Sequence, residues 1–390
     1  MNLVQLSETV ELAGNLHEQI RGGVFPNNTA RQFPGIAKCI NEVLFGVEKL
    51  EIQSASVDDC DAWLNDIEKL LPIWRESIIN RKKGSLERQF YRLYEYFKYV
   101  RKEDIIEEAI SALNTQPADR KSLYTSLPKR YTFLTGKIDV EQGDYSLISI
   151  YTDMIKNEVE NFKWLFFKLA DNRSKAILLR VVKYWFSFDL NNLLDLHENV
   201  FRDYYDLDLV QAGEDDVLVD CGAFDGDSII SFIGTYVNYK KIYGYEISPN
   251  TWTLLNKKLD GFENIVLRNC GVGSKKARIS ISSDDGTAGT KLDSNGSGPL
   301  VNVVTLDEDI EEKISIIKMD IEGAEQDALL GAKNHILNDK PKLLICTYHK
   351  PDDIFQIPRL IDSIRDDYKF YFRYNGRGSI WPCDYVLFAI

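Results

Sequence analysis

The sequence lacks several features that would assign it to a membrane, secreted or zinc-stabilised class. No segment holds 18 uncharged apolar residues, and the N-terminus from Met1 to Glu8 has neither the basic region nor the long apolar run of a signal peptide. The six cysteines show no C-x-x-C spacing, and the four histidines do not cluster with them, so we expect no structural zinc and assign no residue to a metal. These absences predict a cytoplasmic protein without a membrane span and with reduced thiols.

Positive charge is also in deficit. The 390 residues include 47 lysines and arginines against 60 aspartates and glutamates, which gives a net charge of −13. This balance disfavours nucleic acid or an anionic membrane as the main partner and favours neutral or cationic ligands. The apolar fraction of 44% is sufficient for packed cores, and the length suits two or three domains.

A glycine turn at residues 217–228 is the most informative stretch. Three apolar residues from Val217 run into Asp220, a turn flanked by Gly222 and Gly226 follows, and a helix is predicted from Ser228. A strand, a glycine turn and a helix in this order are typical of a nucleotide-cofactor loop, because glycine lets the backbone approach a ligand. A plain strand-to-helix turn is the structural alternative.

The charges around this turn bear on the choice of cofactor. Asp220, Asp225 and Asp227 would repel a pyrophosphate, and the spacing does not match G-x-G-x-x-G. Three carboxylates suit S-adenosylmethionine, which carries an ammonium and a sulfonium. Glu246 closes the next apolar run and is predicted to hold a ribose diol, a role that it would serve in NAD enzymes as well.

Strands and helices alternate after residue 217, which predicts βαβ units and a doubly wound, mainly parallel sheet. Asn269 and Cys270 follow the third strand, where we place them near the adenine, although a turn role explains them equally well. Residues 277–307 depart from the alternation and are predicted to form a hairpin with a long loop over 284–299.

The predicted catalytic residues follow two later strands. Asp320 and Glu322 come directly after the strand at 314–319, ahead of a helix from Glu325 to about Leu337. One acid is enough to cap that helix, so at least Asp320 is expected to be functional. His349 follows the strand at 343–347 and is a candidate base at the same sheet edge. Two late strands at 368–374 and 384–389 complete the sheet as a hairpin.

Residues 1 to about 200 are predicted to be mostly helical, for example at 61–71 and 90–100. The basic stripe over 81–102 is interleaved with glutamates, which favours a solvated helix over a phosphate-binding surface. The aromatic segments 162–167 and 184–186 are interpreted as core, with stacking on a sugar as the minor alternative. Substrate recognition, homo-oligomer formation and docking of a partner enzyme remain open roles for this half.

Taken together, the C-terminal half resembles the FkbM family of S-adenosylmethionine-dependent methyltransferases. The matching stretches are 219–227, Glu246, 269–273, 304–307, 317–325 and 341–344, of which Lys-x-Asp-x-Glu-Gly-Ala-Glu at 318–325 is the specific one. The domains expected are a helical N-terminal domain at 1–145, a helical lead-in at 146–210, and an FkbM-like Rossmann-fold methyltransferase domain at 211–390.

The resemblance implies methyl transfer from S-adenosylmethionine to a hydroxyl of a small-molecule or glycan acceptor. The chain departs from the family at Thr347, where many members carry a glutamate, and its Tyr-His-Lys-Pro turn is similar to a subgroup found beside polysaccharide-assembly genes. The expected cofactor-binding residues are Asp220, Gly222, Ala223, Asp225, Gly226, Glu246, Asn269 and Cys270, and the expected catalytic residues are Asp320, His349 and Glu325.

Three other functions compete with this one. An NAD-binding oxidoreductase is disfavoured by the acidic turn, and an inactive scaffold is disfavoured by the presence of Asp220, Glu246 and Asp320. A nucleic-acid methyltransferase is disfavoured by the net charge and by the lack of an Asn/Asp-Pro-Pro-Tyr element for a flipped base.

Overall fold

The computed structural model describes residues 84–194, 196, 204–281, 298–376 and 379–390. The chain divides into two compact units, 1–92 and 93–390, and the packing described below is that of the second unit. The helix predicted at 61–71 and most of the predicted loop at 284–299 lie outside the described residues. The domain boundaries at 145 and 210 stay predictions.

Helices make up the regular structure of the first described part of the chain, as the sequence predicts. They are α5 (Ser85–Tyr99), which crosses the boundary between the units, α6 (Lys102–Asn114), α7 (Ala118–Thr125), α8 (Leu127–Arg130), α9 (Ser146–Lys168), α10 (Asn172–Ser187) and α11 (Asn191–Leu194). The predicted stripe of charge pairs is only partly visible, with an ion pair of 2.6 Å between Arg101 and Asp104 one turn apart.

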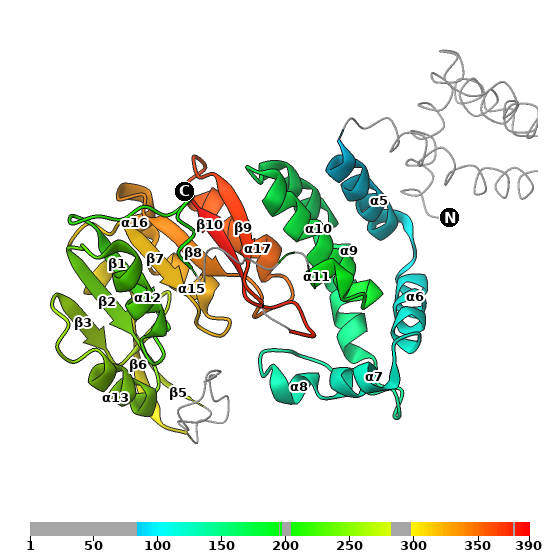
Figure 1. Ribbon diagram of the computed structural model, residues 1–390, viewed down its shortest axis with the longest axis horizontal. Helices are drawn as coiled ribbons and strands as arrows, with labels where there is room; N and C mark the ends of the chain where they lie inside the picture. The colour runs from blue at the N-terminus through cyan, green and yellow to red at the C-terminus, as the bar shows by residue number, and fades with distance from the viewer. Residues whose placement is uncertain (1–83, 195, 197–203, 282–297, 377–378) are drawn as a thin grey trace, which may run out of the picture. The chain divides into compact units, whose positions relative to one another are not determined.

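A seven-stranded sheet forms the centre of the following region (Figure 1), in the order β3-β2-β1-β7-β8-β10-β9. Its strands are β1 (Val217–Cys221), β2 (Lys241–Tyr245), β3 (Ile265–Arg268), β7 (Ile316–Met319), β8 (Lys342–Cys346), β9 (Phe370–Tyr374) and β10 (Tyr385–Ala389). All pairs from β3 to β8 are parallel, whereas β10 pairs antiparallel with both β8 and β9. The predicted doubly wound sheet with a terminal hairpin is confirmed.

The remaining helices connect the strands: α12 (Asp227–Tyr236), α13 (Pro249–Lys258), α14 (Leu306–Asp309), α15 (Glu325–Leu330), α16 (Lys333–Asn338) and α17 (Asp353–Ile364). The single helix predicted from Glu325 to Leu337 is wrong, because it is split in two at Gly331. The carbonyl of Gly331 accepts a hydrogen bond from the backbone N–H of Asp307 at 2.9 Å, and a Cβ there would lie 2.0 Å from the carbonyl oxygen of Gly273. Close packing against another segment therefore ends α15.

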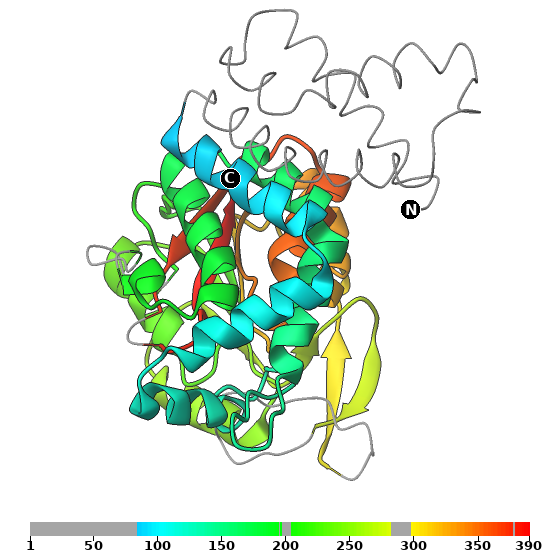
Figure 2. The same ribbon diagram turned by 90° about the vertical axis from the view of Figure 1, so that its right-hand side faces the viewer.

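The predicted hairpin at 277–307 is a second, small sheet. Strand β6 (Leu300–Val304) pairs antiparallel with β5 (Ala277–Ser280) and parallel with β4 (Gly271–Val272). Figure 2 shows β5 and β6 side by side, in yellow-green and yellow, apart from the main sheet.

Two helices that precede the sheet in sequence pack against its edge strand β9 and against helix α17. Helix α10 contacts β9, and α9 contacts α17 (Figure 1). The rings of Tyr151 and Trp381 lie 5.1 Å apart between their centroids, next to the fully buried Tyr184 and Trp185. The core interpretation of the aromatic segment at 184–186 is thus confirmed for these two side chains.

A buried ion-pair network joins the same two regions. Arg373 of β9 binds Asp171, the N-cap of α10, at 3.0 Å and Asp206 at 2.5 Å. Because Asp206 lies two residues after Tyr204, this network ties the segment around Tyr204 to β9.

Candidate active site

The glycine turn after β1 packs against the end of β7. Gly222 has φ = +78°, and a Cβ at this position would lie 1.9 Å from the carbonyl oxygen of Asp320. Gly226 has φ = +88° and is the N-cap of α12. Only glycine fits the first position, because both the space and the backbone conformation exclude a side chain. The turn thereby brings the ends of β1 and β7 into direct contact.

Asp220, at the end of β1, is fully buried and neutralised by a lysine of the neighbouring strand. Lys318 Nζ lies 2.9 Å from Asp220 Oδ1 and donates to the carbonyl of Gly222 at 2.7 Å. Asp220 Oδ2 accepts a hydrogen bond from the Ser228 hydroxyl. Burial by itself lowers the pKa of Lys318, but the carboxylates of Asp220 and Asp320 more than reverse this and raise it. We call Lys318 and Asp220 the Lys318 pair.

The other two carboxylates of the turn face elsewhere. Asp225 is partly exposed and forms an ion pair of 2.8 Å with Lys258, whereas Asp227 Oδ1 accepts from the backbone N–H of Ser228 at 2.7 Å. The sequence analysis considered Asp220, Asp225 and Asp227 together as the charge of the turn. The structure separates them, because Asp220 is buried and paired with Lys318, whereas Asp225 and Asp227 lie nearer the surface.

Glu246 lies at the end of β2, over the same turn. Its Oε2 accepts from the backbone N–H of Phe224 at 3.0 Å and its Oε1 accepts from that of Ser248 at 2.8 Å. Burial raises the pKa of this carboxyl group, and the two backbone N–H groups act against that rise. Two fixed donors orient the carboxylate while leaving lone pairs on both oxygens.

Asn269 and Cys270 stand next to Glu246 across the edge of the sheet. The amide of Asn269 donates to the carbonyl of Glu246 at 2.9 Å, and Cys270 is buried. Together with Gly222 and Ala223, these residues line one region at the carboxyl ends of β1, β2 and β3. Asp225 is turned toward Lys258 at its rim.

The predicted catalytic residues meet at the ends of β7 and β8. His349 Nδ1 lies 2.8 Å from Glu325 Oε1, and His349 Nε2 lies 3.3 Å from Asp320 Oδ1 and 4.0 Å from Glu322 Oε2. The side chains of His349 and Glu325 are 1% and 0% exposed. We call Asp320, Glu322, Glu325 and His349 the Asp320 cluster.

Charge within this cluster favours a protonated histidine. Burial alone lowers the pKa of His349, but Glu325 and Asp320 more than reverse this and raise it well above its usual value. Burial alone raises the pKa of Asp320, yet ion pairing with His349 and Lys318 lowers it. An imidazolium cannot accept a proton, so the unliganded geometry does not by itself make His349 a base.

Two aromatic residues that the sequence analysis missed complete the site. The Tyr204 hydroxyl donates to Asp320 Oδ2 at 2.6 Å, and its ring lies 4.9 Å from Lys318 Nζ. Phe133, from the segment after α8, is partly exposed, and its ring centroid lies 5.6 Å from that of His349 and 5.4 Å from that of Tyr348. Both are more than 100 residues from their partners in sequence, and no local pattern marks them.

Lys318 was also missed, although it carried a signal. It is the one charged residue in β7, whose four positions are all buried. A charge inside a buried strand requires a partner of opposite sign, which the preceding aspartate of β1 supplies.

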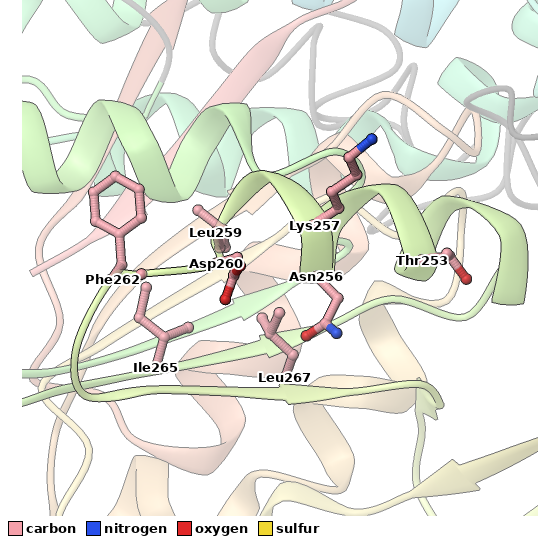
Figure 3. A pocket seen from close by; sticks show the side chains of 9 residues that line it. Thr253, Asn256, Lys257, Leu259, Asp260, Phe262, Ile265 and Leu267 are labelled. Atoms are coloured by element: carbon pink, nitrogen blue, oxygen red, sulfur yellow. The ribbon is translucent and has the colours of Figure 1, made fainter.

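A separate hollow of about 570 Å³ lies between α13 and β3. Figure 3 shows Ile265 and Leu267 of β3 facing Leu259 and Asn256 across it. None of the predicted site residues lines this hollow, so we do not assign the chemistry to it.

The region that contains these strand ends matches a known protein family. Residues 220–372 match the family described as methyltransferase FkbM domain. The C-terminal region of the chain is an FkbM methyltransferase domain. This FkbM domain spans the glycine turn, Glu246 and the Asp320 cluster.

A solved structure agrees with this assignment. The structure of methyltransferase FkbM from Methylobacillus flagellatus KT is 26% identical, with a TM-score of 0.55, and the match covers 66% of this chain and 64% of that one. The chain thus spans less than two thirds of that relative's length. An rRNA methylase from Streptococcus thermophilus (16% identity, 46% of this chain and 87% of that one) and a precorrin-6y C5,15-methyltransferase from Geobacter metallireducens GS-15 (11%, 46% and 82%) match with TM-scores of 0.30, too low to support an argument.

No curated protein matches the chain. Among the residues that the structure describes, none of the helices combines the length and apolar character needed to cross a bilayer.

Proposed function

We propose that this protein is an S-adenosylmethionine-dependent methyltransferase that methylates a hydroxyl of a small-molecule or glycan acceptor. One observation carries the proposal: the glycine turn with Glu246 and the Asp320 cluster lie along the same edge of the sheet, in direct contact through Gly222 and Asp320. Ligands of open α/β sheets bind at this edge, at the carboxyl ends of the strands.

The cofactor would lie over the glycine turn. Glu246, held by two backbone N–H groups, would accept the ribose hydroxyls, and the backbone of Gly222 and Ala223 would line the methionine part. Asp220 contributes through Lys318 and the shape of the turn rather than by direct contact, because its carboxylate is buried and paired. Asn269 and Cys270 would border the adenine.

The acceptor would lie between the Asp320 cluster and Phe133. In the reaction, the hydroxyl oxygen forms a bond to the methyl carbon, the carbon–sulfur bond breaks, and its electron pair stays on sulfur, which becomes a neutral thioether. The hydroxyl proton must leave. Asp320 and His349 are placed to position the hydroxyl and to take part in removing that proton, a role that typically contributes about 10²- to 10⁴-fold in rate.

The aromatic side chains near the cluster favour a sugar or another cyclic acceptor. Phe133 presents a partly exposed ring beside His349, and aromatic rings stack on the apolar faces of pyranoses. In this proposal the helical part of the second unit recognises the acceptor. A role in polysaccharide assembly and a cytoplasmic location are part of the proposal and rest on the sequence.

A thermal-shift titration with S-adenosylmethionine, S-adenosylhomocysteine and NAD tests the cofactor. Ligand at about 100 times its Kd stabilises the folded state by about 2.7 kcal/mol. We expect a shift with both adenosyl compounds that is lost in Glu246→Gln and kept in Glu312→Gln. Glu246 is preferred to Asp220 for this test, because removing Asp220 would leave Lys318 buried without its partner.

A shift with NAD alone would exclude the methyltransferase proposal in favour of an oxidoreductase. No shift with any of the three compounds would favour an inactive scaffold.

A further inference from the structure

We propose that Tyr204 is a positioning residue for methyl transfer, because its hydroxyl fixes the Asp320 carboxylate with one oxygen turned toward His349 and the acceptor. The inference deepens and rests on the proposed function, in which Asp320 positions the acceptor hydroxyl. Tyr204 lies outside the region matched by the family, residues 220–372, so the family comparison assigns it no role.

The Tyr204 hydroxyl makes a short hydrogen bond to an ionised carboxylate. It donates to Asp320 Oδ2 at 2.6 Å, a length typical of a charge-assisted bond between a hydroxyl and a carboxylate. Burial alone raises the pKa of Asp320, but His349, Lys318 and this hydrogen bond more than reverse the rise and lower it. Burial, followed by the charge of Asp320, raises the pKa of the Tyr204 phenol well above its usual value. The phenol therefore stays protonated and keeps donating to this oxygen.

The bond to Tyr204 leaves the other oxygen of Asp320 for the reaction. Asp320 Oδ1 lies 3.3 Å from His349 Nε2 and 3.4 Å from the Tyr348 hydroxyl. The Asp320 side chain is 26% exposed and that of His349 is 1% exposed, so Asp320 is the member of this contact that a bound acceptor can reach. The terminal torsion of an aspartate is broad, so without the Tyr204 hydroxyl the carboxylate is free to turn.

The two residues after Tyr204 anchor it to the domain. Tyr205 is buried, and its ring centroid lies 5.3 Å from that of Phe232 in α12. Asp206 forms the buried ion pair with Arg373 of β9. These contacts hold the backbone of Tyr204 against two elements of the domain, so its hydroxyl acts as a fixed donor at the end of β7.

A fixed carboxylate assists the proposed reaction in the transition state. As the hydroxyl oxygen bonds to the methyl carbon, positive charge develops on that oxygen until its proton leaves, and the electron pair of the broken bond stays on sulfur. A carboxylate that is oriented beforehand stabilises this charge without reorganising. It also keeps the hydroxyl in line with the methyl group, where an error of about 1 Å can cost about 10²-fold in rate.

A second tyrosine–carboxylate contact offers a matched control. Tyr243 of β2 donates to Glu312 Oε1 at 2.7 Å, and Glu312 precedes β7, at the opposite end of that strand from Asp320. Tyr204→Phe and Tyr243→Phe each delete one hydroxyl that donates to a carboxylate. A purely structural role of Tyr204 therefore predicts the same outcome for both variants.

The first measurement is the NMR signal of the His349 ring in the full-length chain labelled with ¹³C-histidine, without any ligand. The chain has four histidines, and variants of the other three assign the signal of His349 by elimination. We expect Tyr204→Phe to shift this signal, because the carboxylate beside His349 Nε2 loses its orientation. Tyr243→Phe should leave the signal in place.

The second measurement is the transfer of a labelled methyl group from S-adenosylmethionine to the methyl glycosides of glucose, galactose and mannose. Tyr204→Phe should lower kcat about 10- to 100-fold. The KM for S-adenosylmethionine and the thermal shift that it causes should stay as in the wild type, because the residues proposed to bind the cofactor are unchanged. Tyr243→Phe should transfer the methyl group at the wild-type rate.

The proposal is overturned if Tyr204→Phe leaves the His349 signal unchanged, if it keeps the wild-type kcat, or if Tyr243→Phe has the same effects. If the wild type methylates none of the glycosides but is still shifted by S-adenosylmethionine, the sugar acceptor of the proposed function is wrong, and the NMR comparison alone decides on Tyr204. Failure of the proposed function appears instead as the absence of a thermal shift with both adenosyl compounds, which would remove any role of Tyr204 in methyl transfer.

Discussion

Lys318 lies in β7 and Asp320 directly follows that strand. They belong to two groups of charged residues, the Lys318 pair and the Asp320 cluster, which differ in how their charges are balanced. The Lys318 pair is closed: one ammonium lies 2.9 Å from one carboxylate oxygen, and the other oxygen accepts a hydrogen bond from the Ser228 hydroxyl. The Asp320 cluster is open: the carboxylates of Asp320 and Glu325 lie 3.3 and 2.8 Å from the two nitrogens of one histidine, so two acids share one base. Removing one partner of a one-to-one buried pair leaves a lone buried charge, whereas His349 keeps a second carboxylate when one of its two is removed.

The largest expected effect comes from breaking the closed group. Lys318→Met should lower the free energy of unfolding by about 3 to 5 kcal/mol, because it leaves the Asp220 carboxylate buried and unpaired. Urea unfolding followed by circular dichroism measures this loss. The double variant Lys318→Met with Asp220→Asn is the control and should recover much of the stability. Equal instability of the single and double variants would contradict a closed ion pair.

Breaking the open group should affect the reaction more than the fold. Asp320→Asn is expected to lower the rate of methyl transfer to an accepted hydroxyl by about 10²- to 10⁴-fold, because in the proposed function Asp320 positions that hydroxyl. The free energy of unfolding should fall by about 1 to 2 kcal/mol, less than for Lys318→Met, because Tyr204 and His349 lose an ionised acceptor while His349 keeps Glu325. Transfer of a labelled methyl group and urea unfolding measure the two effects. A loss of stability similar to that of Lys318→Met would mean that the two groups do not differ.

Gly222 joins the two groups, so a substitution there should disturb both. Gly222→Ala places a methyl group 1.9 Å from the Asp320 carbonyl oxygen at φ = +78°, and we expect a loss of about 1 to 3 kcal/mol in the free energy of unfolding. Binding of S-adenosylmethionine, measured by calorimetry, should weaken as well. Gly234→Ala has open space at its Cβ and serves as the control. Stability and binding equal to the wild type would show that the turn does not pack as described.

The smallest effect is expected at a surface network on the opposite end of the sheet. Glu312 binds Lys241 at 2.9 Å and Lys240 at 3.0 Å, and the hydrogen bond from Lys241, followed by that from Tyr243, lowers the pKa of Glu312 to about 2. Glu312→Gln should cost about 0.5 to 1 kcal/mol at pH 7, as for other exposed pairs.

The sign of the pH dependence follows from the lowered pKa. The stabilisation by Glu312 is complete above its unfolded-state pKa and is lost as the pH falls from about 4.5 toward about 2. The difference in unfolding free energy between wild type and Glu312→Gln should therefore vanish over that interval. A difference that stays constant down to pH 2 would rule out the ion pairs as its cause.

The sequence by itself determined the parts of this protein that depend on local pattern. Alternating strands and helices after Val217 gave the parallel sheet, and glycines at 222 and 226 gave the turn, because only glycine accepts the backbone conformations there. Acids and a histidine at strand ends predicted that the candidate site lies at one edge of the sheet, since parallel strands bring their carboxyl ends together.

Only the tertiary structure decided which of these groups face one another. It buried Asp220 against Lys318, turned Asp225 toward Lys258, and brought Tyr204 and Phe133 to the Asp320 cluster from more than 100 residues away. The physical reason is that periodicity fixes the face on which a side chain lies, whereas its partner across the edge is set by packing of distant segments. The balance of charge in the site, closed at Lys318 and open at His349, is a property of that packing.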